Sequence, residues 1–255
     1  MKPLSKREHA KALQAFANYP LLEHASDSSI KSLIGAAVFQ RCQKGERLLS
    51  EAQLATDVCF LLEGVARIFH QSDDGLEFTP KIMAAPNHFG DLELLARRST
   101  NGQSVEVLSE ALVARVPWGT IKEILLEDHQ LCVDWLSGIA SQFVYTIDAD
   151  RHNVFLGLGG RVANVLLSYG HVFGQQTPDG LELDVEMSRD GLARQVGSVK
   201  RAVLRVVQAF TKRGWIDTRG PRLLIKDQRA LQGQTLSRRL GLGHRTIPLS
   251  LIESA

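Results

Sequence analysis

The sequence predicts an α+β protein with an N-terminal antiparallel β jelly-roll, a long dimerisation helix and a C-terminal winged helix-turn-helix. Three observations predict this order: closely spaced apolar runs separated by turns, then heptad-spaced apolar residues, then a basic helix-pair pattern. The expected segments are residues 1–119 for the β domain, 120–156 for the helix and a hinge, 157–226 for the winged helix, and 227–255 for a loose tail.

The composition is typical of a soluble protein with one sizeable core or two modest ones. The chain has 255 residues, 44% of them hydrophobic, and no apolar run approaches the roughly 18 residues of a membrane span. The N-terminal stretch MKPLSKREHAKALQAFANY carries charges throughout, which excludes a secretory signal peptide. Cys42, Cys59 and Cys132 are far apart and odd in number, so they offer no disulfide framework. We therefore expect a cytoplasmic protein with no membrane partner.

Short helices and closely spaced strands make up the expected β domain. Residues 4–17 and 27–36 have helical spacing, and Ser26 or Asp27 is the expected N-cap of the second helix. Segment 37–117 contains short apolar runs such as DVCFLLEG, VARIF, FTPKIM, SVEVL and ALVARVP. These runs are separated by turn pairs, namely Lys44-Gly45, Glu63-Gly64, Asp74-Gly75 and Asn101-Gly102. Short strands at this spacing predict an antiparallel barrel or jelly roll.

The helix expected from about residue 120 carries apolar residues at the a and d positions of a heptad. The residues on this seam follow one another at alternating steps of four and three: Cys132, Leu136, Ile139, Phe143 and Thr146. The spacing predicts a homodimer in which two copies of the helix pair; the alternative is one helix that covers its own barrel. The glycines of LGLGG, residues 156–160, each cost about 1 kcal/mol in a helix and predict a hinge. The helix resumes at 161–169, and LELDVEM predicts a strand.

Charge is distributed unevenly along the chain, although the total is only +2. Residues 188–226 hold ten Lys or Arg and two acids, a net charge of +8. Residues 1–187 hold sixteen basic and twenty-four acidic residues, a net charge of −8. This segregation is typical of a polyanion-binding domain joined to a domain that does not bind polyanions.

The basic segment contains SRDGLARQVGSVKRAVLRVVQAF, residues 188–210, which meets the steric needs of a helix-turn-helix. Leu192 and Val196 give the first helix an apolar face, and Ala193 is small where two helices must cross closely. Gly197 stands where the tight turn requires a left-handed backbone, which glycine adopts without strain. Ser198 is the expected cap of the second helix.

The second helix of this pair has one apolar and one basic face. Its buried residues are expected at Val203, Val206, Val207 and Phe210. Arg201, Arg205, Gln208 and Lys212 then fall on the opposite face, where arginines can read the acceptor edge of guanine in a major groove. GWIDTRGPRLLIK follows as two short strands around a turn, which completes a winged helix with Arg219 and Arg222 able to reach phosphates.

This order of parts resembles the family of the cyclic AMP receptor protein and the fumarate–nitrate regulator, the Crp/Fnr transcription factors. The resemblance covers about residues 15–226 and rests on QKGERL, FLLEGVARI, FGDLELL, GRVANVLL and the helix-turn-helix. It implies a cyclic-nucleotide-binding-like β domain, a homodimer on double-stranded DNA with a pseudo-palindromic operator, and RNA polymerase as a partner. By this resemblance, the residues expected to contact DNA bases are Val199, Lys200, Arg201 and Arg205. Those expected to contact DNA phosphates are Ser188 and Arg189.

Segment 89–105, FGDLELLARRSTNGQSV, is similar to the family's nucleotide-binding cassette. In that family a glycine and a glutamate lead the loop, the acid holds the ribose, and an Arg-Ser pair closes on the phosphate. Gly90 and Ser104 match this pattern, whereas Asp91 is one methylene shorter than glutamate and Gln103 replaces the arginine. Thr146 falls where the family contacts adenine.

The charges in this cassette argue against cyclic AMP as the effector. A buried phosphate diester needs a fixed cation, but Gln103 is neutral and Glu93 adds a negative charge nearby. We therefore expect a degenerate effector pocket that takes either another, unidentified small molecule or nothing. The alternative is a cyclic-nucleotide-dependent regulator in which Arg97 or Arg98 replaces the missing arginine.

Other chemistries lack the residues that they need. A cupin-type metal enzyme on the same β-barrel is the remote alternative, but only His70 and His88 of the eight histidines fall in the barrel segment 37–117. His88 or Cys59 could ligate a haem, and Cys132 could act as a thiol switch. A packed residue is the commoner interpretation of each. We expect no catalytic residue, no metal site and no cofactor.

Overall fold

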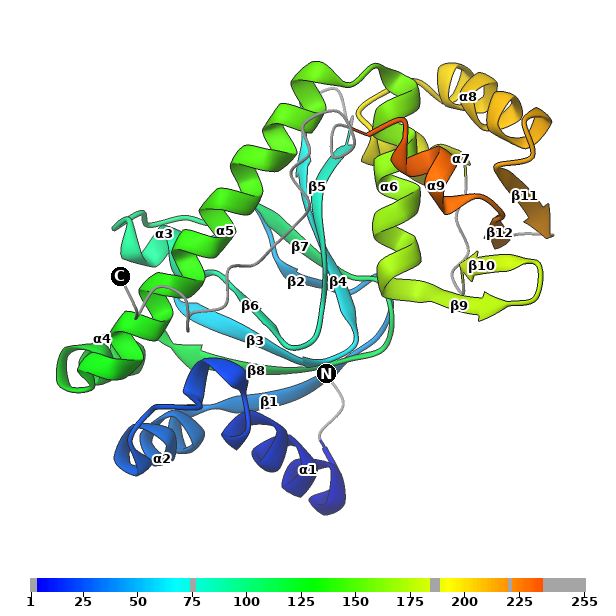
Figure 1. The fold of residues 1–255 in the computed structure, drawn as a ribbon. Helices are drawn as coiled ribbons and strands as arrows, with labels where there is room; N and C mark the ends of the chain where they lie inside the picture. The colour runs from blue at the N-terminus through cyan, green and yellow to red at the C-terminus, as the bar shows by residue number, and fades with distance from the viewer. Residues whose placement is uncertain (1–3, 74–76, 184–188, 220–221, 236–255) are drawn as a thin grey trace, which may run out of the picture. The chain divides into compact units, whose positions relative to one another are not determined.

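The computed structural model describes residues 4–73, 77–183, 189–219 and 222–235 (Figure 1). They form two compact units, residues 1–147 and 148–255. Among the described residues no helix is both long and apolar enough to cross a bilayer. The predicted α+β class is confirmed: a β jelly-roll comes first, a long helix follows, and a helix-turn-helix comes last.

The first unit begins with two α-helices joined by a single turn of 3-10 helix. Helix α1 spans Lys6–Ala17 and starts with a capping box between Ser5 and Glu8. The turn η1 spans Pro20–Leu22, and helix α2 spans Asp27–Ala36. Ser26 caps α2, as predicted, because its hydroxyl accepts a hydrogen bond from the Ser29 backbone N–H.

The jelly-roll consists of two four-stranded sheets in which every pair of neighbouring strands is antiparallel. One sheet has the order β1-β8-β3-β6 and the other has the order β2-β7-β4-β5. The strands are β1 Val38–Cys42, β2 Arg47–Leu49, β3 Asp57–Glu63, β4 Val65–Gln71, β5 Glu77–Ala84, β6 Asn87–Phe89, β7 Ser104–Val107 and β8 Ala111–Pro117. A short helix α3, Asp91–Leu95, follows β6. The predicted turn at Asp74-Gly75 lies outside the described residues.

The sheet that contains β3 is buried on both faces, which explains why this strand reads as a continuous apolar run. Cys59 and Leu61 point into the core between the two sheets. Val58 and Phe60 alternate with them and pack against the helices on the outer face. Figure 1 shows α1 and α2 along this outer face, beside β1 and β8.

The predicted single helix from residue 120 is in fact two helices, α4 at Trp118–Glu127 and α5 at His129–Phe155. The break falls at Asp128, whose backbone is extended. Its carboxylate accepts hydrogen bonds from the backbone N–H groups of Ser26 at 2.9 Å and Leu131 at 3.0 Å. Asp128 therefore caps α5 and ties it to α2, a long-range contact that local spacing could not reveal.

The residues of the predicted dimer seam on α5 differ in exposure. Leu136 and Phe143 are exposed, but Ile139 packs against the outer-face core and Cys132 is half-buried. An exposed apolar stripe shares Leu136 and Phe143 with the predicted seam and otherwise lies one position further along α5, which Trp135 anchors to the roll. We call it the α5 stripe; its members are Val133, Leu136, Ala140, Phe143 and Ile147. The side chain of Thr146 lies outside the described part of the chain.

The second unit is a helix-turn-helix with a four-stranded sheet. Its helices are α6 Leu158–Phe173, α7 Arg189–Gln195 and α8 Lys200–Lys212, and its strands are β9 Gly174–Thr177, β10 Gly180–Leu183, β11 Ile216–Arg219 and β12 Arg222–Ile225. The sheet order is β11-β12-β10-β9. The predicted strand at 181–187 is therefore described only to Leu183, and β9 was missed. Gly159 and Gly160 lie inside α6, so the helix breaks only at residues 156–157.

The prediction of a loose tail is wrong for the first residues after Lys226. Helix α9, Gln228–Gln232, packs against α6, and its Leu231 is fully buried. Asp227 caps this helix by accepting a hydrogen bond from the Ala230 backbone N–H at 2.8 Å. Residues 236–255 lie outside the described residues.

Candidate nucleic-acid interface and effector pocket

The turn between α7 and α8 has the geometry that the sequence predicted. Gly197 adopts a left-handed backbone with φ of 60°, and Leu192, Ala193 and Val196 are buried. The Ser198 backbone N–H donates to the Ala193 carbonyl at 3.0 Å, which closes the turn. These contacts fix the angle at which α8 leaves α7.

The predicted cap of α8 is one residue off. The N-cap position is held by Val199, no side chain caps the helix there, and Ser198 precedes the cap. The helix therefore starts at Lys200, and no side chain caps its first backbone N–H groups. Such groups can be satisfied by an anion such as a DNA phosphate.

The outward face of α8 carries exposed basic side chains. Val203, Val207 and Phe210 are buried, whereas Val206 is half-buried. The exposed side chains are those that the sequence placed there: Arg201, Arg205, Gln208 and Lys212. None of these three cations forms an ion pair with another residue in the described part of the chain. Their charge is therefore available to an external polyanion.

Other residues proposed for the interface differ in their surroundings. Lys200 forms an ion pair with Asp190 at 2.9 Å, and Val199 is 65% exposed. In the wing, Arg222 lies 3.6 Å from the Glu182 carboxylate, so this arginine is held against β10. Ser188 lies outside the described residues, as do the side chains of Arg189 and Arg219.

In the first unit, the acid that leads the cassette has partners within the protein. Asp91 is almost fully buried, and its carboxylate accepts a hydrogen bond from the Trp135 indole N–H at 3.0 Å. His88 Nε2 lies 3.5 Å away from the same oxygen. Burial raises the pKa of Asp91, but the interactions with His88 and Trp135 outweigh it, and the pKa is lowered overall. Asp91 thus anchors α5 to the roll instead of offering a free acceptor to a ligand.

Glu93 places a second buried carboxylate in the cassette. One of its oxygens accepts a hydrogen bond from the Gly102 backbone N–H at 3.1 Å. The other oxygen, Oε2, is buried and has no hydrogen-bond partner among the residues that the structure describes. Ser104 is also engaged, because its hydroxyl accepts the Glu51 backbone N–H at 3.0 Å. The loop therefore uses a carboxylate where a phosphate-binding loop would need positive charge.

The two arginines that could replace the missing cation lie at the surface. Arg97 and Arg98 are exposed, and Arg97 has a left-handed backbone with φ of 56°. The Nη1 atom of Arg98 would lie 3.7 Å from a Cβ atom added at Gly102, so Arg98 reaches over the loop. Gln103 is half-buried.

The residues considered for redox or haem chemistry are packed as ordinary core residues. Cys59 is buried, and burial raises the pKa of its thiol to about 12. His88 lies in an aromatic cluster with Tyr19, Phe60 and Trp135. Across the described residues no group of three or more His, Cys, Asp or Glu side chains is placed to hold a metal ion.

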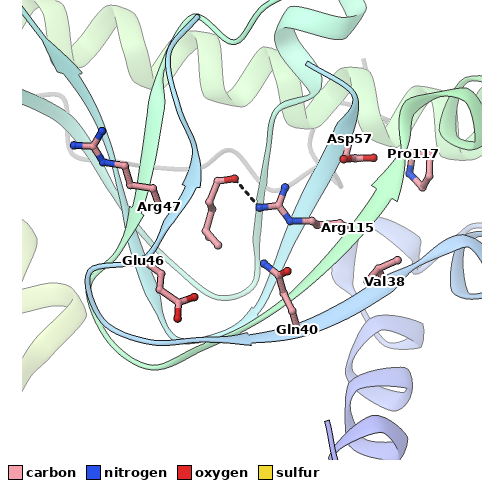
Figure 2. Close-up of a pocket in the computed structure, with 8 residues that line it drawn as sticks. Val38, Gln40, Glu46, Arg47, Asp57, Arg115 and Pro117 are labelled. Carbon is pink, nitrogen blue, oxygen red and sulfur yellow. Dashed lines mark hydrogen bonds between the residues drawn. The ribbon is translucent and has the colours of Figure 1, made fainter. Parts of the chain in front are cut away.

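A pocket of about 360 Å³, which local sequence patterns did not predict, lies in the first unit on the side of the roll formed by β1, β2, β3 and β8 (Figure 2). Its charged and polar lining residues are Gln40, Glu46, Arg47, Asp57 and Arg115. They come from β1, β2, β3 and β8 and, for Glu46, from the turn before β2, and they converge only in the folded roll. No local spacing signals such a site.

Two family profiles match the chain: the cyclic nucleotide-binding domain over residues 39–128 and the Crp-like helix-turn-helix domain over residues 160–233. A cyclic-nucleotide-binding-type roll joined to this DNA-binding domain defines a class of transcription regulator. The chain belongs to the Crp/Fnr family of these regulators. Its relatives are regulators and not enzymes, so the prediction of no enzymatic activity is confirmed.

Individual relatives are distant but cover most of both chains. The CRP-like cAMP-activated global transcriptional regulator of Mycobacterium tuberculosis is 22% identical over 188 residues, 74% of this chain and 84% of the relative. The global nitrogen regulator of Synechococcus elongatus is 23% identical over 196 residues, 76% and 88% of the two chains.

Solved structures of low identity share the fold. A crp/fnr-family regulator from Eubacterium rectale has a TM-score of 0.72 at 17% identity, covering 85% of this chain and 97% of that one. The c-di-GMP responsive regulator CLP of Xanthomonas campestris has a TM-score of 0.68 at 16% identity, covering 78% and 99%.

Proposed function

We propose that the protein is a homodimeric, sequence-specific transcription regulator of the cytoplasm that binds a pseudo-palindromic operator and contacts RNA polymerase. The observation that carries this proposal is the outward face of α8. Arg201, Arg205 and Lys212 are exposed there without ion pairs to described residues, on a helix-turn-helix closed by the left-handed Gly197. A helix of this kind enters a major groove, with two half-sites about one turn of DNA apart in a dimer.

The α5 stripe supports the homodimer. Leu136 is 58% exposed and Phe143 is 65% exposed, on the same helix face as the other members of the stripe. Apolar residues that repeat at three- and four-residue steps and face solvent in one subunit are buried when two such helices pair. Two bound subunits explain why the operator would have two related halves.

Within this function, we propose that cyclic AMP is not the effector. Proteins similar to this chain respond to different signals, since the mycobacterial regulator is cAMP-activated and the Xanthomonas regulator CLP is c-di-GMP responsive. In this chain the cassette contains the buried carboxylate of Glu93, and Gln103 replaces the expected arginine. Bringing a phosphate next to an unpaired buried carboxylate costs like-charge repulsion as well as desolvation.

The test is operator selection from a random duplex library with purified protein, followed by affinity measurement with and without millimolar cyclic AMP. We expect a palindromic consensus and an unchanged affinity on adding the nucleotide. If cyclic AMP tightens binding tenfold or more, the alternative is correct, and Arg98, which already reaches over the loop, is the cation to examine. Recovery of no consensus at all would contradict the proposed sequence-specific regulator.

A further inference from the structure

We infer that the pocket on the β1, β2, β3 and β8 side of the roll is a binding site for a small zwitterion, an α-amino acid with an apolar side chain. We name it the Arg115 pocket. It lies entirely within the first unit and shares no lining residue with the cassette at 89–105. Its volume of about 360 Å³ is within the range of small-molecule sites.

Arg115 supplies the group that would bind a carboxylate. One of its guanidinium nitrogens donates to the Leu48 carbonyl at 2.6 Å, the bond drawn as a dashed line in Figure 2, and this fixes the orientation of the guanidinium. No ion pair to Arg115 occurs in the described parts of the chain. A half-buried guanidinium with donors to spare and no counter-ion is suited to bind a carboxylate through two parallel hydrogen bonds.

Two acids on the same pocket supply the complementary charge. Asp57 and Glu46 line the pocket, and neither forms an ion pair with Arg115 or with any other described residue. Opposite charges that share a pocket without pairing leave room for a ligand that spans them. An ammonium group would satisfy these acids while its own carboxylate reaches Arg115.

Arg47 does not balance these acids. Its guanidinium lies over the Phe69 ring, 5.2 Å from the centroid, and points away from the pocket in Figure 2. Gln40, by contrast, points into the pocket and is only 7% exposed. Its amide nitrogen contacts the Cys42 sulfur at 3.3 Å, which leaves the amide oxygen as a further acceptor for an ammonium group.

The remaining lining residues are apolar: Val38, Leu48 and Pro117. Val38 is 57% exposed, so part of its side chain is free to contact a ligand. Burying an aliphatic side chain against these three residues would add favourable apolar contact. The ligand class is therefore an aliphatic α-amino acid and not a plain anion.

The test is calorimetric titration of the full chain with three matched probes: L-leucine, 4-methylpentanoate, which lacks the amine, and 3-methylbutylamine, which lacks the carboxylate. We expect leucine to bind and each of the two analogues to bind at least about tenfold more weakly. Arg115→Met should weaken leucine binding by at least about tenfold, whereas Lys44→Met, an exposed cation outside the pocket, should leave it unchanged.

Asp57→Asn provides a second variant that is almost the same size as the native residue. It should weaken leucine binding but should not weaken 4-methylpentanoate binding, because Asp57 attracts only the ammonium group. Thermal unfolding of every variant reports whether it is folded. The inference is overturned if leucine shows no binding at about 10 mM, if folded Arg115→Met binds it as tightly as the native chain, or if 4-methylpentanoate matches leucine. Should Arg115→Met fail to fold, the Asp57→Asn variant and the probe comparison still decide the outcome.

Discussion

Asp91, Glu93 and Asp128 show how the partners of single carboxylates define what this protein can bind. Asp91 stands at the cassette position of a ribose-binding acid, yet its hydrogen bond goes to the Trp135 indole. Glu93 leaves one buried oxygen without a partner. The type of residue at a position is therefore a weaker guide to ligand binding than the contacts that its side chain makes.

Asp128 provides the prediction at this scale. The backbone N–H groups of Ser26 and Leu131 donate to its carboxylate and lower its pKa from 3.8 to about 2. A group whose pKa is depressed in the folded state stabilises that state above its unfolded pKa, and the contribution is lost as the pH falls through the folded pKa. Asp128→Asn should therefore destabilise the first unit near neutral pH, and the difference from the native chain should shrink between about pH 4 and pH 2.

Urea unfolding at a series of pH values measures this difference. Glu127→Gln is the matched control, because Glu127 is exposed and forms no hydrogen bond or ion pair with the described residues. A difference between native chain and Asp128→Asn that stays constant down to pH 2 would show that the carboxylate charge plays no part.

At the scale of single elements, α8 carries two kinds of cation. Arg205 lies on the middle of the exposed face, one turn after Arg201, whereas Lys212 is the last residue of the helix. We expect Arg205→Ala to weaken binding to the operator by about 1–3 kcal/mol. The variant should also discriminate less between the bases at one base pair. Lys212→Ala should weaken all sequences alike and reduce the slope of log affinity against log salt by about 1.

Binding to operator and to random duplexes over a range of salt concentrations separates these two effects. Equal losses on both kinds of DNA for both variants would contradict the assignment of Arg205 to the bases. The Gln208→Ala variant, on the same exposed face but uncharged, should leave the salt slope unchanged.

Helix α9 belongs to the folded second unit, and the loss of its packing should lower the free energy of unfolding of this unit. Leu231 is fully buried, and emptying its site with Leu231→Ala should lower the free energy of unfolding of this unit by about 2–4 kcal/mol. Gln232→Ala, which changes an exposed neighbour on the same helix, should have little effect. Hydrogen exchange of the α6 backbone amides over a range of denaturant concentrations reports this unit; equal stability of the two variants would mean that α9 contributes no packing.

At the scale of the whole molecule, the proposed homodimer predicts that the α5 stripe is the contact between subunits. We expect Leu136→Glu combined with Phe143→Glu to convert a dimer into a monomer, because both side chains are exposed in one subunit and would be buried in the pair. The roll itself should remain folded, since neither residue contributes to its buried cores. Sedimentation at micromolar concentration measures the assembly.

Ser141→Glu is the control for this experiment, because Ser141 is exposed on α5 but is not a member of the α5 stripe. It should remain dimeric with unchanged operator affinity. A native chain that is monomeric in solution and still binds a full palindromic operator tightly would contradict the proposed assembly.

Much of this architecture follows from local sequence patterns. Strand-length apolar runs predicted the roll, and Ser26 predicted the start of α2, because capping and alternation depend on neighbours within a few residues. The helix-turn-helix was predicted from the spacing of Leu192, Gly197 and Val203 for the same reason. The prediction that Gln103 stands where the family has an arginine also rests on the local motif, because it follows from the spacing to Gly90 and Ser104.

Tertiary contacts decided the rest. The break at Asp128 depends on Ser26, 102 positions earlier, and the exposed face of α5 depends on Trp135 reaching Asp91. The packing of α9 on α6 and the convergence of four strands at the Arg115 pocket also join distant segments. The sequence by itself determined which elements form and which charges they carry, since these depend on near neighbours. Which face of each element is covered, and which carboxylate is already occupied, was decided only when distant residues packed together, because burial is a property of the folded chain.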